Sequence, residues 1–381
     1  MKLTIQRTSF LKLLNFAIQA IPAKSADTQF LNFLLTLKGD EVSVISSDGS
    51  LSTKVVQKKK DEKGNDVILA MEEGSIQAPA KYLLDIVSKL GGDVVTLNMV
   101  DTNYLNISDD TTNFNLVTKD GAEYPDIDLL VPEDGGFELK IKDLKKLFDT
   151  TFYAVATKGP KEIYFGINVS TRNGKAYFLA TDSYRMARYA VSIPGDETRS
   201  FTCPVKALQM AGNLEGENCR IYLDNQRALF VSGGNVISTR LLKGEFPDAD
   251  RLIPPSFPCK VEVDTEEFLA AADRVKIISS AEDKNSQVRM TISPESGVTL
   301  FAKSTNYGNS DEVLRKATFS LPEGESIFEI GFNVDFVIDA VKALDSAKVT
   351  FVFSSPTRMF MVKNDDPENI QIITPIRINT F

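Results

Sequence analysis

The chain has 381 residues, a 43% hydrophobic composition and 16 prolines, which fits a globular protein of roughly two to four domains. The net charge is −9 and histidine is absent. A uniformly basic nucleic-acid-binding surface, a His-assisted nucleophile and imidazole metal ligation are therefore excluded.

The N-terminal segment does not predict an export signal, because Arg7 and Lys12 interrupt its apolar residues. No stretch approaches the ~18 consecutive apolar residues of a membrane span. The three cysteines, Cys203, Cys219 and Cys259, are odd in number and lack metal-ligand spacing. We therefore expect reduced thiols, no metal, no cofactor and a cytoplasmic location.

In chain order, the first repeated signal is a short amphipathic helix. It is expected around Phe10, Leu144 and Phe268, which are 134 and 124 positions apart. A second helix is expected to open near Pro79, Pro204 and Asn333, at spacings of 125 and 129 positions, since proline suits a first helical turn and asparagine a cap. The middle copy of this second helix is short, because Gly212 follows closely.

Strand-like runs follow each second helix, at residues 94–100, 220–223 and 349–353, and others fill the intervals, at 42–46, 176–180 and 298–302. A period near 125 is too long for a solenoid. It favours an α+β chain of three similar domains, each with two helices packed on antiparallel sheets. The expected bounds are 1–124, 125–254 and 255–381, where turn residues cluster.

Several short motifs then carry a family resemblance. Residues 180–187 read ATDSYRMA, 244–248 read GEFPD, 251–254 read RLIP, 124–128 read YPDID, 330–334 read IGFNV and 374–377 read TPIR. In this order they resemble segments of the bacterial DNA sliding clamps, the DNA polymerase III beta subunit. The clamp segments usually read ATDGHRLA and, near the C-terminus, MPMR. Ser183, Tyr184, Thr374 and Ile376 depart from these patterns.

The resemblance implies a processivity factor and not an enzyme. It implies a clamp-fold ring, closed as a head-to-tail homodimer, that encircles duplex DNA without sequence specificity. The ring would tether the replicative polymerase, the clamp loader and other clamp-motif peptides that carry a glutamine and then leucine- and phenylalanine-like anchors. The implied peptide pocket comprises Phe165, Thr181, Tyr184, Arg185, Met186, Pro247, Arg251, Leu252, Ile372, Thr374, Pro375 and Ile376.

The resemblance also directs the polar helix faces toward DNA, with Lys24, Lys81, Lys89, Lys145, Lys146, Lys158 and Lys206 facing the duplex. Without it, such lysines would be interpreted as solvated surface. For the dimer interface it implies an edge strand with Phe114 and Leu116, and apolar contact from Ile277 and Ile278.

A size estimate favours a dimer. Six helices of ~10 Å width close a ring about 19 Å across the helix axes, whereas twelve leave roughly 28 Å clear for a duplex roughly 20 Å wide.

Two other classes of function stay open when the residues are considered without the family resemblance. One is a carboxylate-based hydrolase on a β-rich scaffold, although no acid pair is singled out. The other is an adhesin-like binding protein.

Overall fold

A computed structural model describes residues 1–251, 253–281 and 286–378. One order of elements occurs three times along the chain. A strand runs directly into a helix, three strands follow (four in the first and third repeats), and a further strand runs into a second helix. Three more strands follow that helix, and the first repeat adds a short fourth one. This repetition confirms the expected α+β class with three similar domains.

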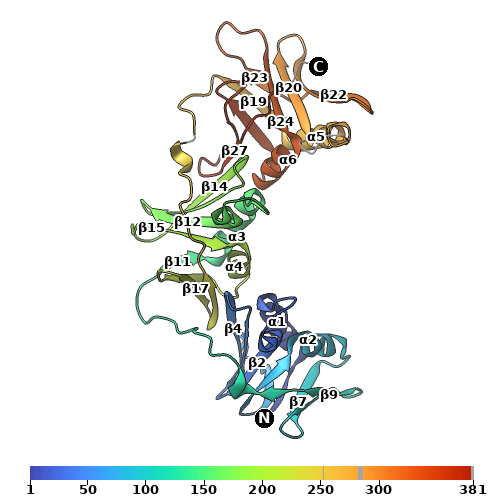
Figure 1. Cartoon of the computed structure of the whole chain (residues 1–381), viewed down its shortest axis with the longest axis vertical. Coiled ribbons are helices and arrows are strands. Elements are labelled where there is room, and N and C mark those ends of the chain that lie inside the picture. The colour runs from blue at the N-terminus through green and yellow to red at the C-terminus, as the bar shows by residue number, and fades with distance from the viewer. Residues whose placement is uncertain (252, 282–285, 379–381) are drawn as a thin grey trace. The chain divides into compact units, whose positions relative to one another are not determined.

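The first repeat contains the helices α1 (Arg7–Ala17) and α2 (Ala80–Lys89). Figure 1 shows them side by side, and they contact each other in the structure. Its strands are β1 (Lys2–Gln6), β2 (Asn32–Lys38), β3 (Glu41–Ser47), β4 (Leu51–Lys58), β5 (Ile68–Glu72), β6 (Gly74–Pro79), β7 (Val94–Met99), β8 (Tyr104–Ser108), β9 (Asn113–Val117) and β10 (Lys119–Asp120).

The second repeat contains α3 (Ile141–Thr151) and α4 (Val205–Ala211), the shorter helix that the sequence predicts. Its strands are β11 (Phe137–Lys140), β12 (Gly166–Arg172), β13 (Lys175–Thr181), β14 (Arg185–Ser192), β15 (Arg199–Pro204), β16 (Asn218–Leu223), β17 (Arg227–Ser232) and β18 (Asn235–Arg240).

The third repeat contains α5 (Thr265–Ser279) and α6 (Val334–Ala343), which contact each other. The side chain of Asn333 caps α6 by accepting hydrogen bonds from the backbone of Asp335 and Phe336, as the sequence predicts. Its strands are β19 (Cys259–Asp264), β20 (Gln287–Ser293), β21 (Gly297–Ser304), β22 (Gly308–Leu314), β23 (Thr318–Ser320), β24 (Phe328–Asn333), β25 (Lys348–Phe353), β26 (Phe360–Lys363) and β27 (Ile370–Ile373).

The described strands form four sheets, and two of these join strands from neighbouring repeats. One has the order β10-β6-β2-β3-β4-β18-β17-β16-β11, and the other has the order β15-β12-β13-β14-β27-β26-β25-β19-β23. The remaining two are β5-β1-β7-β8-β9 and β22-β21-β20-β24. Both junctions are antiparallel, with Ile237 of β18 opposite Thr53 of β4 and Met186 of β14 opposite Ile372 of β27.

Because the sheets cross the repeat boundaries, the chain packs into two compact units. One holds residues 1–144 and 206–241, and the other holds residues 145–205 and 242–381. The first and third repeats each have an apolar core in which helices cover sheets, around Phe10 and Leu83 in one and around Phe268 and Val337 in the other. The expected domain bounds at 124/125 and 254/255 stay predictions. Among the described residues no helix is long and apolar enough to cross a membrane.

Candidate functional site

The pairing of β14 with β27 brings together residues from distant parts of the sequence. Met186 lies opposite Ile372, and Arg185 lies opposite Ile373. Met186 and Ile372 are 5% and 2% exposed. They belong to one apolar cluster whose other buried members are Leu179, Ala249, Val352 and Met361, with Phe246, Ile253, Phe257, Met359 and Ile370 packed partly against it. This cluster forms the floor of the candidate peptide site.

The turn before β14 holds one aromatic side chain outward above this floor. Oδ1 of Asp182 accepts hydrogen bonds from the backbone N–H of Tyr184 and of Arg185, both at 2.9 Å. The hydroxyl of Thr181 donates to the carbonyl of Arg185 at 2.7 Å. Ser183 adopts a φ of 79°, a left-handed conformation that favours glycine, and glycine is the residue the resemblance gives there. Tyr184 is 63% exposed as a result.

Arg185 links this turn to the helix α6. Its Nε lies 3.0 Å from Oδ2 of Asp182, and its Nη1 lies 2.6 Å from Oδ2 of Asp339. The guanidinium carbon also lies 4.5 Å from the ring centroid of Phe336 and 5.2 Å from that of Tyr153. Ion pairs and cation–π contacts therefore fix the guanidinium on several sides.

Two aromatic rings extend the site. The ring of Tyr184 stacks near that of Phe336 with centroids 6.5 Å apart. The hydroxyl of Tyr153 donates to Oε1 of Gln371, a fully buried amide. Burial raises the pKa of Tyr153, so this hydroxyl stays protonated and keeps its donor role.

The segment after β27 completes the arrangement. The N–H of Thr374 donates to the carbonyl of Tyr184 at 2.9 Å, and the N–H of Ile376 donates to the carbonyl of Gly331 at 2.8 Å. A Cβ at Gly331 would lie 2.6 Å from the carbonyl oxygen of Ile376. The close approach of the C-terminal segment to β24 therefore requires glycine at this position.

The structure thus places Thr181, Tyr184, Arg185, Met186, Ile372 and Thr374 together. Of the other predicted pocket residues, Phe165 ends the 3-10 turn Glu162–Phe165 and is half-buried, as are Pro247, Pro375 and Ile376. Arg251 is exposed, with its Nε 3.4 Å from Oδ2 of Asp248. Leu252 lies outside the described residues.

Sequence patterns do not identify Tyr153, Phe336 and Asp339 as parts of this site. From the sequence alone, Asp339 is interpreted only as an acid that reduces the positive charge on its helix. The positions of Phe336 and Asp339 on the predicted third-repeat helix, which follows the IGFNV motif, were the available signal.

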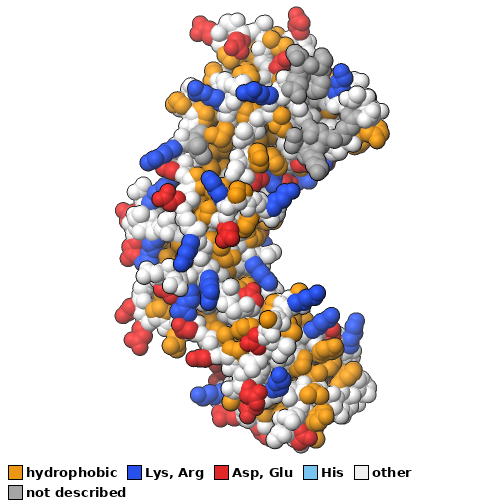
Figure 2. All heavy atoms as spheres, viewed as in Figure 1, with side chains coloured by type: hydrophobic (Ala, Val, Ile, Leu, Met, Phe, Trp, Pro, Cys, Tyr) orange, Lys and Arg blue, Asp and Glu red, His pale blue; other side chains and the backbone are white. Residues whose placement is uncertain are grey.

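The seven lysines predicted to face DNA are all exposed: Lys24, Lys81, Lys89, Lys145, Lys146, Lys158 and Lys206. Lys145 pairs with Asp149 at 2.8 Å, one helical turn away. Nζ of Lys146 lies 5.0 Å from the ring centroid of Tyr189. On the face drawn in Figure 2, Lys and Arg are interspersed with Asp and Glu, so the charge there is mixed rather than gathered in one basic patch.

Of the residues predicted for the dimer interface, Phe114 and Ile277 are exposed, and Ile277 is 70% exposed at the end of α5. Leu116 and Ile278 are half-buried and pack partly against the cores of their own units. The two exposed residues are therefore the ones free to contact another molecule.

All three cysteines are buried free thiols, and burial raises the pKa of each. They are therefore protonated and unreactive at neutral pH. Within the part of the chain that the structure describes, no cluster of three or more Cys, Asp or Glu side chains could hold a metal ion.

Comparison with known proteins decides the family. The models of the N-terminal, central and C-terminal domains of the DNA polymerase III beta subunit match residues 1–128, 138–248 and 250–377. The chain belongs to the DNA polymerase III beta subunit family. It is 28% identical to the beta sliding clamp of Staphylococcus epidermidis strain RP62A, and equally to that of Staphylococcus aureus strain Mu50, over 99% of each chain.

Solved structures of beta subunits are similar over the whole chain. The sliding clamp of Bacillus subtilis has a TM-score of 0.90 at 25% identity, with 100% of both chains covered. The beta subunit of Streptococcus pyogenes has the same TM-score and identity, covering 99% of this chain and 100% of that one. As a beta subunit the chain functions as a sliding clamp, a DNA polymerase processivity factor and not an enzyme, and the hydrolase alternative has no support.

Proposed function

We propose that this beta subunit works as a head-to-tail homodimeric ring around duplex DNA and tethers a replicative polymerase through the site at Tyr184 and Met186. The observation that carries the ring is the order of strands in the four sheets. Two of the three equivalent sheet junctions are made within the chain, and the third is left for a second copy.

The three repeats contribute equivalent sets of strands. The sets β6-β2-β3-β4, β15-β12-β13-β14 and β24-β20-β21-β22 correspond to one another, as do β1-β7-β8-β9, β11-β16-β17-β18 and β19-β25-β26-β27. Within the chain β4 pairs with β18, and β14 pairs with β27. In both junctions the last strand of the first set in one repeat pairs with the last strand of the second set in the next repeat. The equivalent partner of β22 is therefore β9. Among the described strands, however, each of these two has one neighbour only.

An open, exposed strand edge is a template for pairing with another chain. Pairing β22 of one molecule with β9 of another would satisfy both edges and place Val313 and Phe114, both exposed, in the contact. Helix α5 backs β22, where Arg274 forms two hydrogen bonds with Glu312 at 2.7 and 2.8 Å. Ile277 on this helix would supply apolar contact. A head-to-tail interface of this kind produces a ring when its rotation closes.

The peptide site is proposed from the apolar cluster under Met186 and Ile372 and from the polar groups around it. Partner peptides with leucine- and phenylalanine-like anchors need an apolar surface with a few oriented polar groups, which the Tyr184 and Phe336 rings and the Arg185 network supply. The clamp loader is proposed to use the same site. Tethering raises the local concentration of the polymerase at its template.

DNA contact is proposed for the seven exposed lysines, with weak direct affinity because the chain carries a net charge of −9. A closed ring retains DNA by topology and does not need tight contact.

A role on replicating DNA supports a cytoplasmic location. We retain 1–124, 125–254 and 255–381 as the proposed domain bounds, although each of the two nine-stranded sheets crosses one of them.

Sedimentation of the purified protein at micromolar concentration tests the ring. The expected mass is twice the 42.0 kDa of the chain. Ile277→Asp should shift the protein toward monomer, because it places a charge in an apolar contact. The matched control is Leu130→Asp, since Leu130 is 85% exposed and lies outside β9, β22 and α5. A monomeric wild type, or a series of masses that grows without limit, would contradict a closed dimer.

A further inference from the structure

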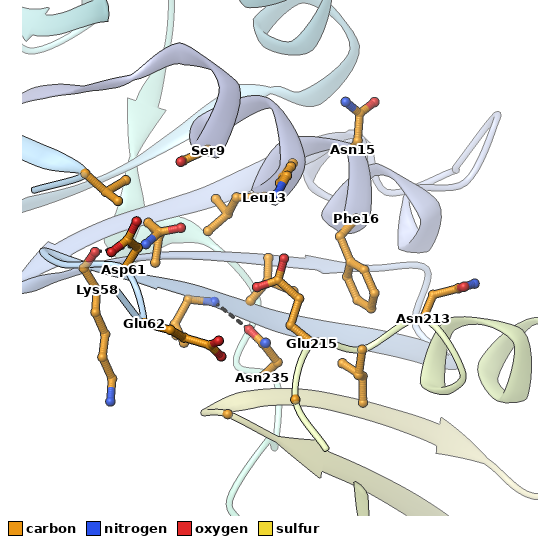
Figure 3. Close-up of a pocket in the computed structure, with 18 of the residues that line it drawn as sticks. Ser9, Leu13, Asn15, Phe16, Lys58, Asp61, Glu62, Asn213, Glu215 and Asn235 are labelled. Carbon is orange, nitrogen blue, oxygen red and sulfur yellow. Dashed lines mark hydrogen bonds between the residues drawn. The ribbon is translucent and has the colours of Figure 1, made fainter. Parts of the chain in front are cut away.

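The loop between β4 and β5 has a dense group of lysines. Lys58, Lys59, Lys60 and Lys63 fall within six residues, and all four are exposed. Lys58 and Lys60 share a cleft of about 640 Å³ with Lys12 of α1 (Figure 3). This cleft lies within the compact unit 1–144 and 206–241, between α1, β4 and the turns 213–216 and 233–235.

The loop is held in one conformation beside α1. Oδ1 of Asp61 accepts the backbone N–H of Lys63 at 2.9 Å and that of Asn65 at 2.8 Å. Lys60 forms a β-bridge with Asp66, and the side chain of Gln6, which precedes α1, donates to the carbonyl of Asp66 at 2.8 Å. The lysine backbones are therefore ordered before any ligand arrives, which lowers the entropic cost of binding.

In the part of the chain that the structure describes, these lysines form no salt bridges. Among the described residues, no carboxylate oxygen lies within 4 Å of the ammonium group of Lys12, Lys58, Lys59, Lys60 or Lys63. Some other lysines are paired, as Lys175 is with Glu368 at 2.6 Å and Lys348 is with Glu262 at 2.8 Å. Unpaired ammonium groups on a fixed loop are available to an external anion.

Acidic residues limit which anion can bind. Figure 3 shows the carboxylates of Glu62 and Glu215 turned toward the middle of the cleft and the ammonium end of Lys58 directed away from Asp61. A small anion deep in the cleft would meet these carboxylates. An extended polyanion that passes over the loop and the exposed side of α1, where Thr8, Lys12 and Asn15 lie, would contact several lysines at once, with Glu62 the exposed acid among them.

We propose that Lys12, Lys58, Lys59, Lys60 and Lys63 form a contact site for the phosphate backbone of duplex DNA, in addition to the seven lysines named above. The inference rests on the proposed function, because it takes the polyanion to be the encircled duplex. Contacts of this kind are made to phosphates and carry no sequence information. They suit a protein that must move along any sequence.

Lysine footprinting on the whole protein tests the site directly. The protein is acetylated with an N-hydroxysuccinimide ester, with and without a short duplex at low salt, and each lysine is quantified by mass spectrometry. We expect DNA to slow acetylation of Lys12, Lys58 and Lys60 severalfold and to leave Lys38 unchanged. Lys38 is exposed in the same unit and does not line the cleft. Protection of Lys24 and Lys81 with an unprotected loop would overturn the inference while leaving the proposed function intact.

A second measurement uses the salt dependence of duplex binding. The double variant Lys58→Gln with Lys60→Gln should reduce the slope of log K against log salt by roughly 0.9 for each phosphate that the variant no longer neutralises, and Lys38→Gln should not change it. An unchanged slope in the double variant overturns the inference, as does protection of the loop by an acidic peptide but not by duplex. If the wild type protects no lysine at all with duplex, the proposed function fails along with the inference.

Discussion

Nη1 of Arg185 lies 2.6 Å from Oδ2 of Asp339, so an ion pair joins the start of β14 to the helix α6. Arg185 also pairs with Asp182, whose other oxygen shapes the turn that presents Tyr184. The orientation of the exposed tyrosine therefore depends on an acid 155 positions further along the sequence. This relationship makes α6 part of the proposed peptide site.

Asp339→Asn should weaken the binding of a polymerase-tail peptide. A partly exposed ion pair contributes ~0.2–1 kcal/mol, so we expect affinity to fall by up to about fivefold. The measurement is fluorescence anisotropy with a labelled peptide. Asp149→Asn, which breaks the exposed Lys145–Asp149 pair, is the control and should bind normally. Unchanged affinity in Asp339→Asn would show that α6 does not orient the site.

Gly331→Ala should displace the C-terminal segment from β24. The new Cβ would lie 2.6 Å from the carbonyl oxygen of Ile376, a distance that requires the backbone to shift. We expect a lower melting temperature and a severalfold loss of peptide affinity, since Thr374 and Ile376 move with the segment. Gly91→Ala is the control, because its Cβ would meet no atom within 4 Å. Equal melting and binding in the two variants would contradict this account of the segment.

Stability should fall at alkaline pH because of Tyr124. Burial, with a smaller effect of the nearby Asp27 charge, raises the pKa of Tyr124 from 10.0 to about 12. Below pH 10 the phenol is protonated in both folded and unfolded chains. Between pH 10 and 12 the unfolded chain loses its proton first, so folding loses up to ~1.4 kcal/mol per pH unit there. In urea titrations Tyr124→Phe should lose less stability than wild type over that interval. Parallel pH profiles would contradict this assignment.

The elements were predictable because their signals are local. The apolar faces around Phe10, Leu144 and Phe268 and the helix starts after Pro79, Pro204 and Asn333 all lie where the sequence places them. Pro79, however, occupies the cap position and not the first turn. The joining of sheets across the repeats was not predicted. Strands such as β4 and β18 are far apart in the sequence, and their pairing leaves no periodic pattern.

The residues of the proposed peptide site were predicted only through the family resemblance, and their role in binding a peptide stays a prediction. Motif positions identify Arg185 and Met186 but not the contacts that these residues make, so Asp339 and Phe336 were missed. The burial of Met186 also determines which substitution can test peptide binding. Met186 is 5% exposed, so Met186→Asp would disturb the apolar cluster as well as any peptide contact. The exposed Tyr184 is the better position for a specificity test.

Retention on DNA circles tests the sliding clamp account most directly. Labelled protein is loaded onto nicked circular plasmid and washed in moderately high salt, and its retention is measured before and after a single cut linearises the plasmid. Because a closed ring is held by topology while phosphate contacts fade with salt, the protein should persist on the circle and be released once the DNA has ends. Equal retention on circular and linear DNA would mean that local contacts hold the protein, and it would contradict the ring.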